Sequence, residues 1–182
     1  MRVLERFFDQ VCVLELSGRT DLRGTMTVSY SRQDLQGLPA DVAIREQRVY
    51  SIPAAGTFFG IHYQKGNSPL VRIVSVIQGA GLDYIIDLRR DSATYRQWRA
   101  VELTGETPKA VLVPAGFGHA FLSTRDQTIQ LFGMSGSFEG GHAGKINWRD
   151  PEIGLKLPME QIILSDADRN APMLSELLSK KI

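Results

Sequence analysis

The stretch Gly56-Thr-Phe-Phe-Gly-Ile-His-Tyr-Gln64 places His62, one of three histidines in the chain, in an apolar run typical of a β-strand. A second stretch, Pro114-Ala-Gly-Phe-Gly-His-Ala-Phe121, places His119 in a similar setting. Strands direct alternate side chains to one face, so two imidazoles from separate strands can share one interior. The two segments therefore predict a β-barrel whose interior is polar and functional.

Short strand-like runs separated by glycine and proline turns extend over most of the chain. Strands are expected over residues 11–16, 25–30, 42–52, 57–64, 70–77, 82–88, 97–103, 110–113, 119–123 and 128–134. Helices are expected only from Ser31 to about Gly37 and from Asp168 to Lys180, and the glycine-rich stretch Gly133 to Gly144 is expected to be a loop. This pattern predicts a mainly β fold, a jelly-roll or cupin-like barrel with a short C-terminal helix.

Length and composition limit the classes of protein that fit. A chain of 182 residues fits a single domain, 1–182, and the net charge of +1 gives no reason to expect nucleic-acid binding. The lone Cys12 excludes an internal disulfide and a multi-cysteine zinc site, and it favours a reducing cytoplasm. Charges within the first nine residues argue against a signal peptide, and no apolar stretch approaches the length of a membrane span.

Alternation places polar and apolar side chains together on several strand faces. The shared faces are Gly60, His62 and Gln64; Arg72, Val74 and Val76; Asp83, Ile85 and Asp87; and Thr128, Gln130 and Phe132. Mixed faces of this kind suit the mouth of a barrel that is lined for a ligand. The alternative is that the charged residues lie on the solvated outer face, and alternation alone does not decide between the two.

Four segments resemble the dTDP-4-dehydrorhamnose 3,5-epimerase family. They are Gly60-Ile-His-Tyr-Gln64, Ile86-Asp-Leu-Arg-Arg90, Pro114 to Phe121, and Ile146-Asn-Trp-Arg-Asp-Pro151. Asp21-Leu-Arg-Gly24 and Leu164 to Pro172 are similar to the family's opening turn and closing motif. The resemblance covers nearly the whole chain in order. It implies a cupin fold, a nucleotide-sugar substrate, a homodimer that exchanges an N-terminal segment of about residues 1–30, and no metal or organic cofactor.

The resemblance also implies a chemistry. A keto group acidifies the hydrogens on neighbouring sugar carbons, a base removes one of them, and the enolate is stabilised and reprotonated from the opposite face. His62 matches the family's base, and Asp168 matches the aspartate that orients it. Substrate-binding roles are implied for Asp83 and His119 in the barrel, for Gln47 on the nucleotide, and for Arg23, which would hold the pyrophosphate across the dimer interface.

The departures from the family fall in the same site. The tyrosine taken as the opposing acid corresponds to Phe132, which has no ionisable proton, and the lysine after it corresponds to Gly133. The lysine near the keto oxygen corresponds to Arg72, which can stabilise an enolate but stays charged. The arginine before the histidine motif corresponds to Phe59, and a nucleotide-binding asparagine corresponds to Val49. Phe59 and Phe132 remain candidates for stacking on the substrate.

Three functions compete. The retained His62 and Asp168 favour an epimerase or isomerase of a nucleotide-4-keto-6-deoxysugar, which acts at a single carbon if the opposing acid is absent. The alternative is a non-catalytic paralogue that binds a sugar nucleotide. A metal-dependent cupin is disfavoured, because such sites gather several histidines and Tyr63-Gln64 follows His62.

Structural roles also compete at individual residues. Asp168 could cap the terminal helix, and Arg72 and Asp83 could form a cross-strand ion pair. The pair Arg89-Arg90 is expected to be a solvated turn.

Overall fold

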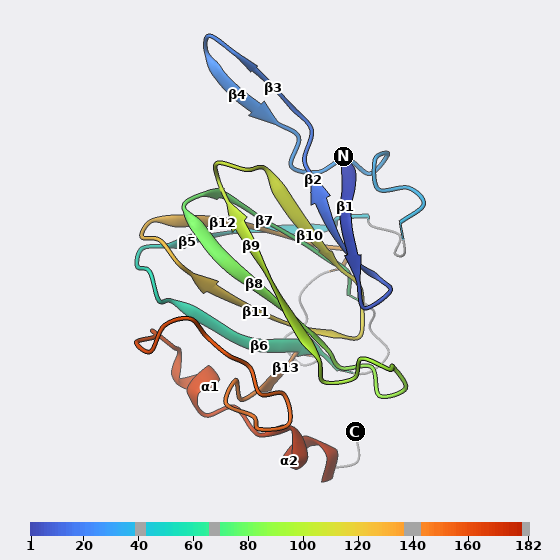
Figure 1. The fold of residues 1–182 in the computed structure, drawn as a ribbon, viewed down its shortest axis with the longest axis vertical. Helices are drawn as coiled ribbons and strands as arrows, with labels where there is room; N and C mark the ends of the chain where they lie inside the picture. Colours follow the sequence, from blue (N-terminus) through green and yellow to red (C-terminus); the bar gives the residue numbers. More distant parts are fainter. Residues whose placement is uncertain (39–42, 66–69, 137–142, 180–182) are drawn as a thin grey trace.

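Two antiparallel β-sheets face each other in the computed structural model, which describes residues 1–38, 43–65, 70–136 and 143–179 (Figure 1). The first sheet has the strand order β1-β2-β10-β7-β12-β5, and the second has the order β13-β6-β11-β8-β9. The C-terminal helices cover the outer face of the second sheet. This arrangement confirms the predicted mainly β, jelly-roll class.

The element bounds are as follows. The first sheet contains β1 (Arg2–Phe7), β2 (Val11–Glu15), β5 (Glu46–Ile52), β7 (Arg72–Gln78), β10 (Lys109–Val113) and β12 (Thr128–Met134). The second contains β6 (Phe58–Gln64), β8 (Ala80–Asp87), β9 (Trp98–Thr104), β11 (Phe117–Ser123) and β13 (Ala143–Ile146). The helices are α1 (Asp166–Arg169) and α2 (Leu174–Ser179), and neither could span a membrane.

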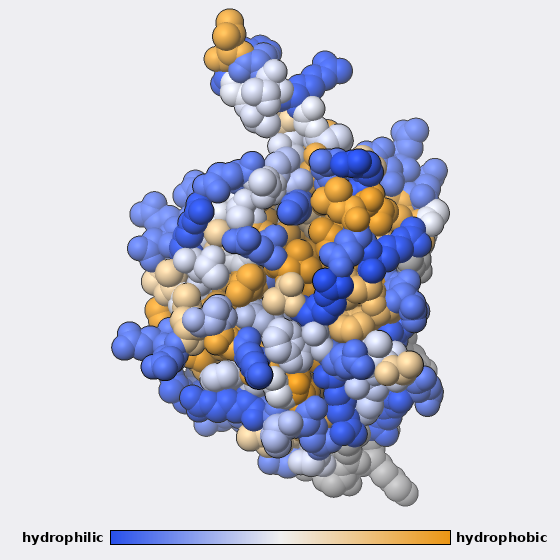
Figure 2. All heavy atoms as spheres, viewed as in Figure 1, coloured by the Kyte–Doolittle hydropathy of each residue, from blue (hydrophilic) through white to orange (hydrophobic). Residues whose placement is uncertain are grey.

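A separate hairpin, β3 (Gly18–Asp21) and β4 (Gly24–Thr27), projects from the body of the molecule. All eight of its strand residues are exposed. Figure 2 shows apolar side chains on this hairpin. Leu22, in its turn, is fully exposed, and Met26, on β4, is 54% exposed. Within this subunit the hairpin therefore buries none of its strand residues.

The apolar core lies in three layers. The central layer fills the space between the sheets, with Val74, Val76, Ile85, Val111 and Phe121 among its members. A second layer packs the five-stranded sheet against the C-terminal segment, and a third covers the outer side of the six-stranded sheet. Burying one such side chain contributes about 1.5–3 kcal/mol, so the two sheets are held together mainly by apolar contact.

Both predicted helices differ from the observed structure. Residues 32–37 form turns instead of a helix, with hydrogen bonds between residues three apart that bring Leu35 into the core. Ser31 Oγ accepts a hydrogen bond from the Asp34 N–H at 3.3 Å, as a cap would, but Gly37 has φ +79°, which is not helical, and ends the turns. The terminal helix is split into α1 and α2, since Pro172 cannot donate a backbone hydrogen bond and disfavours a helical residue before it. Lys180 lies outside the described residues.

Strands β1, β3 and β13 were not predicted from the sequence. Strand β13 begins in the expected glycine-rich loop and pairs with β6, and Gly144 makes that pairing sterically feasible. A Cβ atom at Gly144 would lie 2.3 Å from the Tyr63 ring. Glycine is depleted in strands, so the composition of this segment concealed the strand. Strand β5 begins at Glu46, later than expected, and Val42 is outside the described residues.

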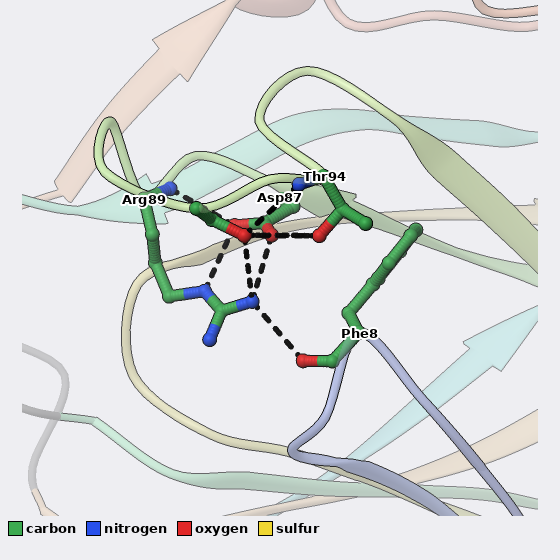
Figure 3. Close-up of polar contacts among 5 residues, drawn as sticks. Phe8, Asp87, Arg89 and Thr94 are labelled. Atoms are coloured by element: carbon green, nitrogen blue, oxygen red, sulfur yellow. Dashed lines mark hydrogen bonds and ion pairs between the residues drawn. The ribbon is translucent and has the colours of Figure 1, made fainter.

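A buried ion-pair network closes one end of the barrel, and Figure 3 shows its members. Asp87 is fully buried, and its carboxylate accepts hydrogen bonds from Arg89, Ser92 and Thr94, three of them at 2.6–2.7 Å. The Arg89 guanidinium also donates to the carbonyl of Phe8, in the turn between β1 and β2, at 3.0 Å. The expectation that Arg89 belongs to a solvated turn is therefore wrong, because its charge is used to hold Asp87.

Burial opposes the ionisation of Asp87, but the hydrogen bonds from Arg89, Ser92 and Thr94 outweigh it and lower the pKa of the carboxyl to about 2. This carboxylate is therefore charged at neutral pH. Its role is structural, since it holds Arg89, Ser92 and Thr94 of the β8–β9 loop together, and Arg89 in turn links this loop to the turn between β1 and β2.

Candidate active site

A cavity of about 260 Å³ lies between the two sheets and is lined from both. One wall, on the six-stranded sheet, carries Arg48, Tyr50, Arg72, Gln130, Phe132 and Met134. The facing wall, on the five-stranded sheet, carries Phe59, His62, Gln64, His119, Phe121 and Lys145, with Tyr63 also at the edge. Five of the residues predicted for the site therefore line this cavity: Phe59, His62, Arg72, His119 and Phe132. Arg72, Asp83 and Asp87 are buried, so the alternative that these charged side chains lie on the solvated outer face is wrong.

A bulge in β6 turns two of these side chains inward. The register against β11 slips, so that His119 pairs with His62 and Phe121 pairs with Phe59. Phe59 and His62 are three residues apart, yet both line the cavity, whereas strict alternation would separate them. The prediction that Gly60 shares the inward face is wrong, because Gly60 lies beneath Asp168. A Cβ atom there would be 3.1 Å from that of Asp168.

His62 and Asp168 form a direct pair. Nε2 of His62 lies 2.6 Å from Oδ1 of Asp168, which is in the first turn of α1 and is only 5% exposed. The His62 side chain is 38% exposed, so its ring remains accessible from the cavity. With Nε2–H donated to the carboxylate, Nδ1 is the nitrogen that can accept a proton from a substrate.

Asp168 is held as an anion by two further partners. Lys145 Nζ donates to the same Oδ1 at 2.8 Å, and Ser165 Oγ donates to Oδ2 at 2.7 Å. Burial opposes ionisation, but the bonds from His62, Lys145 and Ser165 prevail and hold the pKa of Asp168 well below its usual range. The alternative role of helix cap is wrong, since Ser165 is the N-cap of α1.

Lys145 was not identified from the sequence. It lies on β13 directly opposite His62 in the strand register. Lys145 follows the glycine-rich stretch and stands one residue before the Ile146 motif. That local sequence does not indicate a strand, and only the pairing of β13 with β6 brings Lys145 to Asp168.

The second histidine has its own carboxylate. His119 Nε2 lies 2.6 Å from Asp83 Oδ1, and both residues are buried. The alternative ion pair between Arg72 and Asp83 is not formed as a direct contact, because Arg72 donates instead to the Phe117 carbonyl at 3.3 Å. Burial lowers the pKa of Arg72 to about 10, although the charge of Asp83 opposes this effect. Arg72 therefore remains a cation at neutral pH, aimed into the cavity.

An aromatic cluster forms the remaining part of the cavity. Phe132 lies with its ring centroid 5.3 Å from that of His119 and 6.0 Å from that of Tyr50. Tyr50 also packs edge-on against Phe59 at 5.4 Å. Tyr50 and Arg48 were not identified from the sequence, although β5 alternates cleanly, with Gln47 and Val49 exposed and Arg48 and Tyr50 turned inward.

Two predicted binding residues lie away from this cavity. Arg23 is at the turn of the β3–β4 hairpin, with its side chain 89% exposed and paired with Asp21 at 2.6 Å. Gln47 is exposed on the outward face of β5. Within one subunit the structure therefore does not bring Arg23 or Gln47 to His62.

The described residues contain no cluster of three or more His, Cys, Asp or Glu side chains that could hold a metal ion. Each cavity histidine is instead paired with one carboxylate. His142 lies outside the described residues.

Comparison with known proteins gives a consistent result. A family model described as dTDP-4-dehydrorhamnose 3,5-epimerase matches residues 6–176. A relative of that name from Methanothermobacter thermautotrophicus is 30% identical over 178 residues, which is 96% of this chain and 95% of the relative.

Solved structures agree with this match. The crystal structure of dTDP-4-dehydrorhamnose 3,5-epimerase from Bacillus anthracis, with TDP and PPi bound, is 34% identical with a TM-score of 0.91, covering 95% of this chain and 99% of that one. A 3'-monoepimerase from Streptomyces bikiniensis, in complex with dTDP-quinovose, is 29% identical with a TM-score of 0.86, covering 93% and 87%.

Proposed function

Because the chain is an epimerase of the dTDP-4-dehydrorhamnose 3,5-epimerase family, we propose that it inverts one ring carbon of a nucleotide-linked 4-keto-6-deoxysugar. The observation that carries this proposal is the His62–Asp168 pair at the wall of a cavity that also holds a buried cation, Arg72. A base and an enolate-stabilising charge are the two groups that proton abstraction beside a ketone requires.

The first step is removal of a ring proton by His62. Nδ1 takes the proton, and the imidazolium that forms is balanced by the ionised Asp168 at Nε2. Lys145 and Ser165 keep that carboxylate fixed in place, so the ring is oriented before the substrate arrives. The electrons of the C–H bond move into the ketone and give an enolate.

The enolate is stabilised by charge. Arg72 contributes a cation that survives burial, and a preorganised cation in a partly dry cavity is more effective than the same charge in water. His119, held by Asp83, is a second polar group on the facing wall. These groups explain stabilisation of the intermediate, but Arg72 is a poor proton donor because it stays charged.

Reaction at one carbon is favoured by the composition of the cavity. Phe132 lies in the cavity at the position where the family resemblance places a tyrosine that donates a proton. A phenylalanine has no proton to donate, so the two-carbon reaction lacks the acid expected from the family. The 3'-monoepimerase from Streptomyces bikiniensis, 29% identical to this chain, shows that a protein of this fold can react at one carbon.

A homodimer is part of the proposal. The β3–β4 hairpin projects from the body with Leu22 and Met26 exposed at or near its tip, which is costly in water unless another surface covers them. Docking on a second copy would carry Arg23 to the partner's cavity, where a guanidinium can grip a diphosphate. Gln47 is exposed beyond the cavity, so its predicted nucleotide contact requires the nucleotide to extend outside.

Proton NMR in deuterated water tests the proposal. With dTDP-4-keto-6-deoxyglucose and related nucleotide sugars, deuterium is expected at one ring carbon, with inversion of that carbon. His62→Asn should abolish the exchange while leaving the melting temperature nearly unchanged. Exchange at two carbons would contradict the single-carbon reaction, and an unchanged rate in the variant would remove His62 as the base.

A further inference from the structure

We propose that Tyr50 supplies the proton to the sugar face opposite His62, the role that Phe132 cannot fill. This inference rests on the proposed function and adds a residue to it. The way β5 lines the cavity assigns this role to Tyr50.

Tyr50 lies on the wall of the cavity opposite His62. Strand β5 pairs directly with β12, so that Tyr50 stands opposite Gln130 and Arg48 stands opposite Phe132. Tyr50 and Phe132 therefore belong to the same wall, and their rings meet edge-on at 6.0 Å with an interplanar angle of 81°. His62 is on the facing sheet. A sugar ring between the walls would present one face to His62 and the other to Tyr50.

The other side chains that line the cavity do not fit this role. Lys145, Tyr63 and His119 carry transferable protons, but all three are on the same sheet as His62. On the opposite wall, Arg48 and Arg72 act as cations, and Arg72 is already bound to the Phe117 carbonyl and assigned to the enolate charge, while Gln130, Phe132 and Met134 have no acidic proton. Among the described residues that line the cavity, Tyr50 is then the uncharged acid on the opposite wall.

Arg48 lies next to Tyr50 on the same face of β5. The Arg48 guanidinium lies beside the Tyr50 hydroxyl, and its Nε donates a hydrogen bond to the Glu46 carboxylate at 2.7 Å. A cation beside a phenol stabilises the phenolate that remains after the proton has been given away. Arg48 thus lowers the cost of the step without donating a proton itself.

The proposed step balances. His62 takes the hydrogen of the reacting carbon as a proton, and the electron pair of that bond forms the enolate. Tyr50 O–H then gives its proton to the other face of the same carbon, and the ketone re-forms. The phenolate, held by Arg48, regains a proton from water, and the His62 imidazolium returns its proton to water. The carbon is inverted, and no oxidant or reductant is used.

Two readouts from one experiment test the role. Deuterium exchange into the substrate reports proton removal by His62, and formation of the epimer reports donation from the opposite face. In Tyr50→Phe, epimer formation should fall at least about 100-fold, the usual contribution of a general acid. Exchange with retention of configuration should continue near the wild-type rate, because His62 can return a deuteron to its own face.

Two further variants complete the design. Tyr50→Phe combined with Phe132→Tyr restores a phenol on the same wall and should recover epimer formation. Tyr84→Phe is the matched control, since Tyr84 packs among Phe58 and Trp98 on the other side of the second sheet and should keep both readouts.

The outcomes are distinct. Epimer formation at the wild-type rate in Tyr50→Phe would overturn the assignment. Loss of both exchange and epimer formation, with an unchanged melting temperature, would also overturn it by assigning Tyr50 to substrate binding. Absence of exchange in the wild-type protein with every nucleotide 4-keto sugar would instead overturn the proposed function, and the role of Tyr50 with it.

Discussion

Lys145 and His62 stand opposite each other on paired strands, and both side chains bind the same oxygen of Asp168, at 2.8 and 2.6 Å. One carboxylate oxygen therefore serves a fixed cation and the proposed base together. Lys145 therefore helps to fix the Asp168 carboxylate at the position from which it orients the His62 ring.

Replacing this ammonium should weaken catalysis. In Lys145→Met, Asp168 loses one of its three side-chain donors and orients the His62 ring less firmly, so kcat should fall by about tenfold. Steady-state kinetics measures the fall in kcat. Lys156→Met, at an exposed position outside the cavity, is the control. An unchanged kcat in Lys145→Met would contradict this role.

Gly60→Ala should impair catalysis more than stability. The added Cβ atom would lie 3.1 Å from Cβ and 3.2 Å from Cγ of Asp168, so the carboxylate must move by a few tenths of an ångström. Displacement on this scale weakens a catalytic hydrogen bond, and we expect kcat to fall by about tenfold or more. Steady-state kinetics and thermal melting, taken together, separate the two effects. A large loss of melting temperature with unchanged kcat would contradict the prediction.

The Asp87 network should make the protein sensitive to acid. Its folded pKa, about 2, is below the ordinary value for an aspartate, so its contribution to stability is full above about pH 4 and is lost as the pH falls towards 2. The shift corresponds to about 2 kcal/mol. The free energy of unfolding of Asp87→Asn should be lower than that of the wild type by at least that amount at pH 7, and it should fall less steeply as the pH is lowered. Urea unfolding at pH 7, 5 and 3 measures both, and parallel pH curves for the two proteins would exclude this role.

Arg23 should act through the partner subunit. Arg23→Ala is expected to raise KM for the nucleotide sugar about tenfold or more, the loss of a charge-assisted bond to a diphosphate, with little change in kcat. Arg19→Ala, on the same exposed hairpin, is the matched control. Sedimentation should give a dimer for the wild type and both variants. A monomer would contradict the docking of the hairpin, and an unchanged KM in Arg23→Ala would contradict the phosphate contact.

Much of the site was accessible from local sequence. Period-two alternation correctly grouped Arg72 with Val74 and Val76, and the resemblance identified His62 and Asp168, which the structure places in contact. Alternation failed at Gly60, where one extra residue in β6 reverses the facing of the following side chains. In β5 the same alternation turns Arg48 and Tyr50 towards the cavity, and these two residues were not predicted.

The sequence by itself determined the class of fold, because turn residues and alternating polarity are local properties that specify strands wherever they pack. Only the tertiary structure decided which strands became neighbours. Asp168 lies 106 residues from His62, and Lys145 reaches the same oxygen from a strand hidden in a glycine-rich segment. Tyr50 likewise faces the cavity only because β5 joins the wall opposite β6. Such contacts depend on the burial of whole sheet faces against each other, which no single strand can specify.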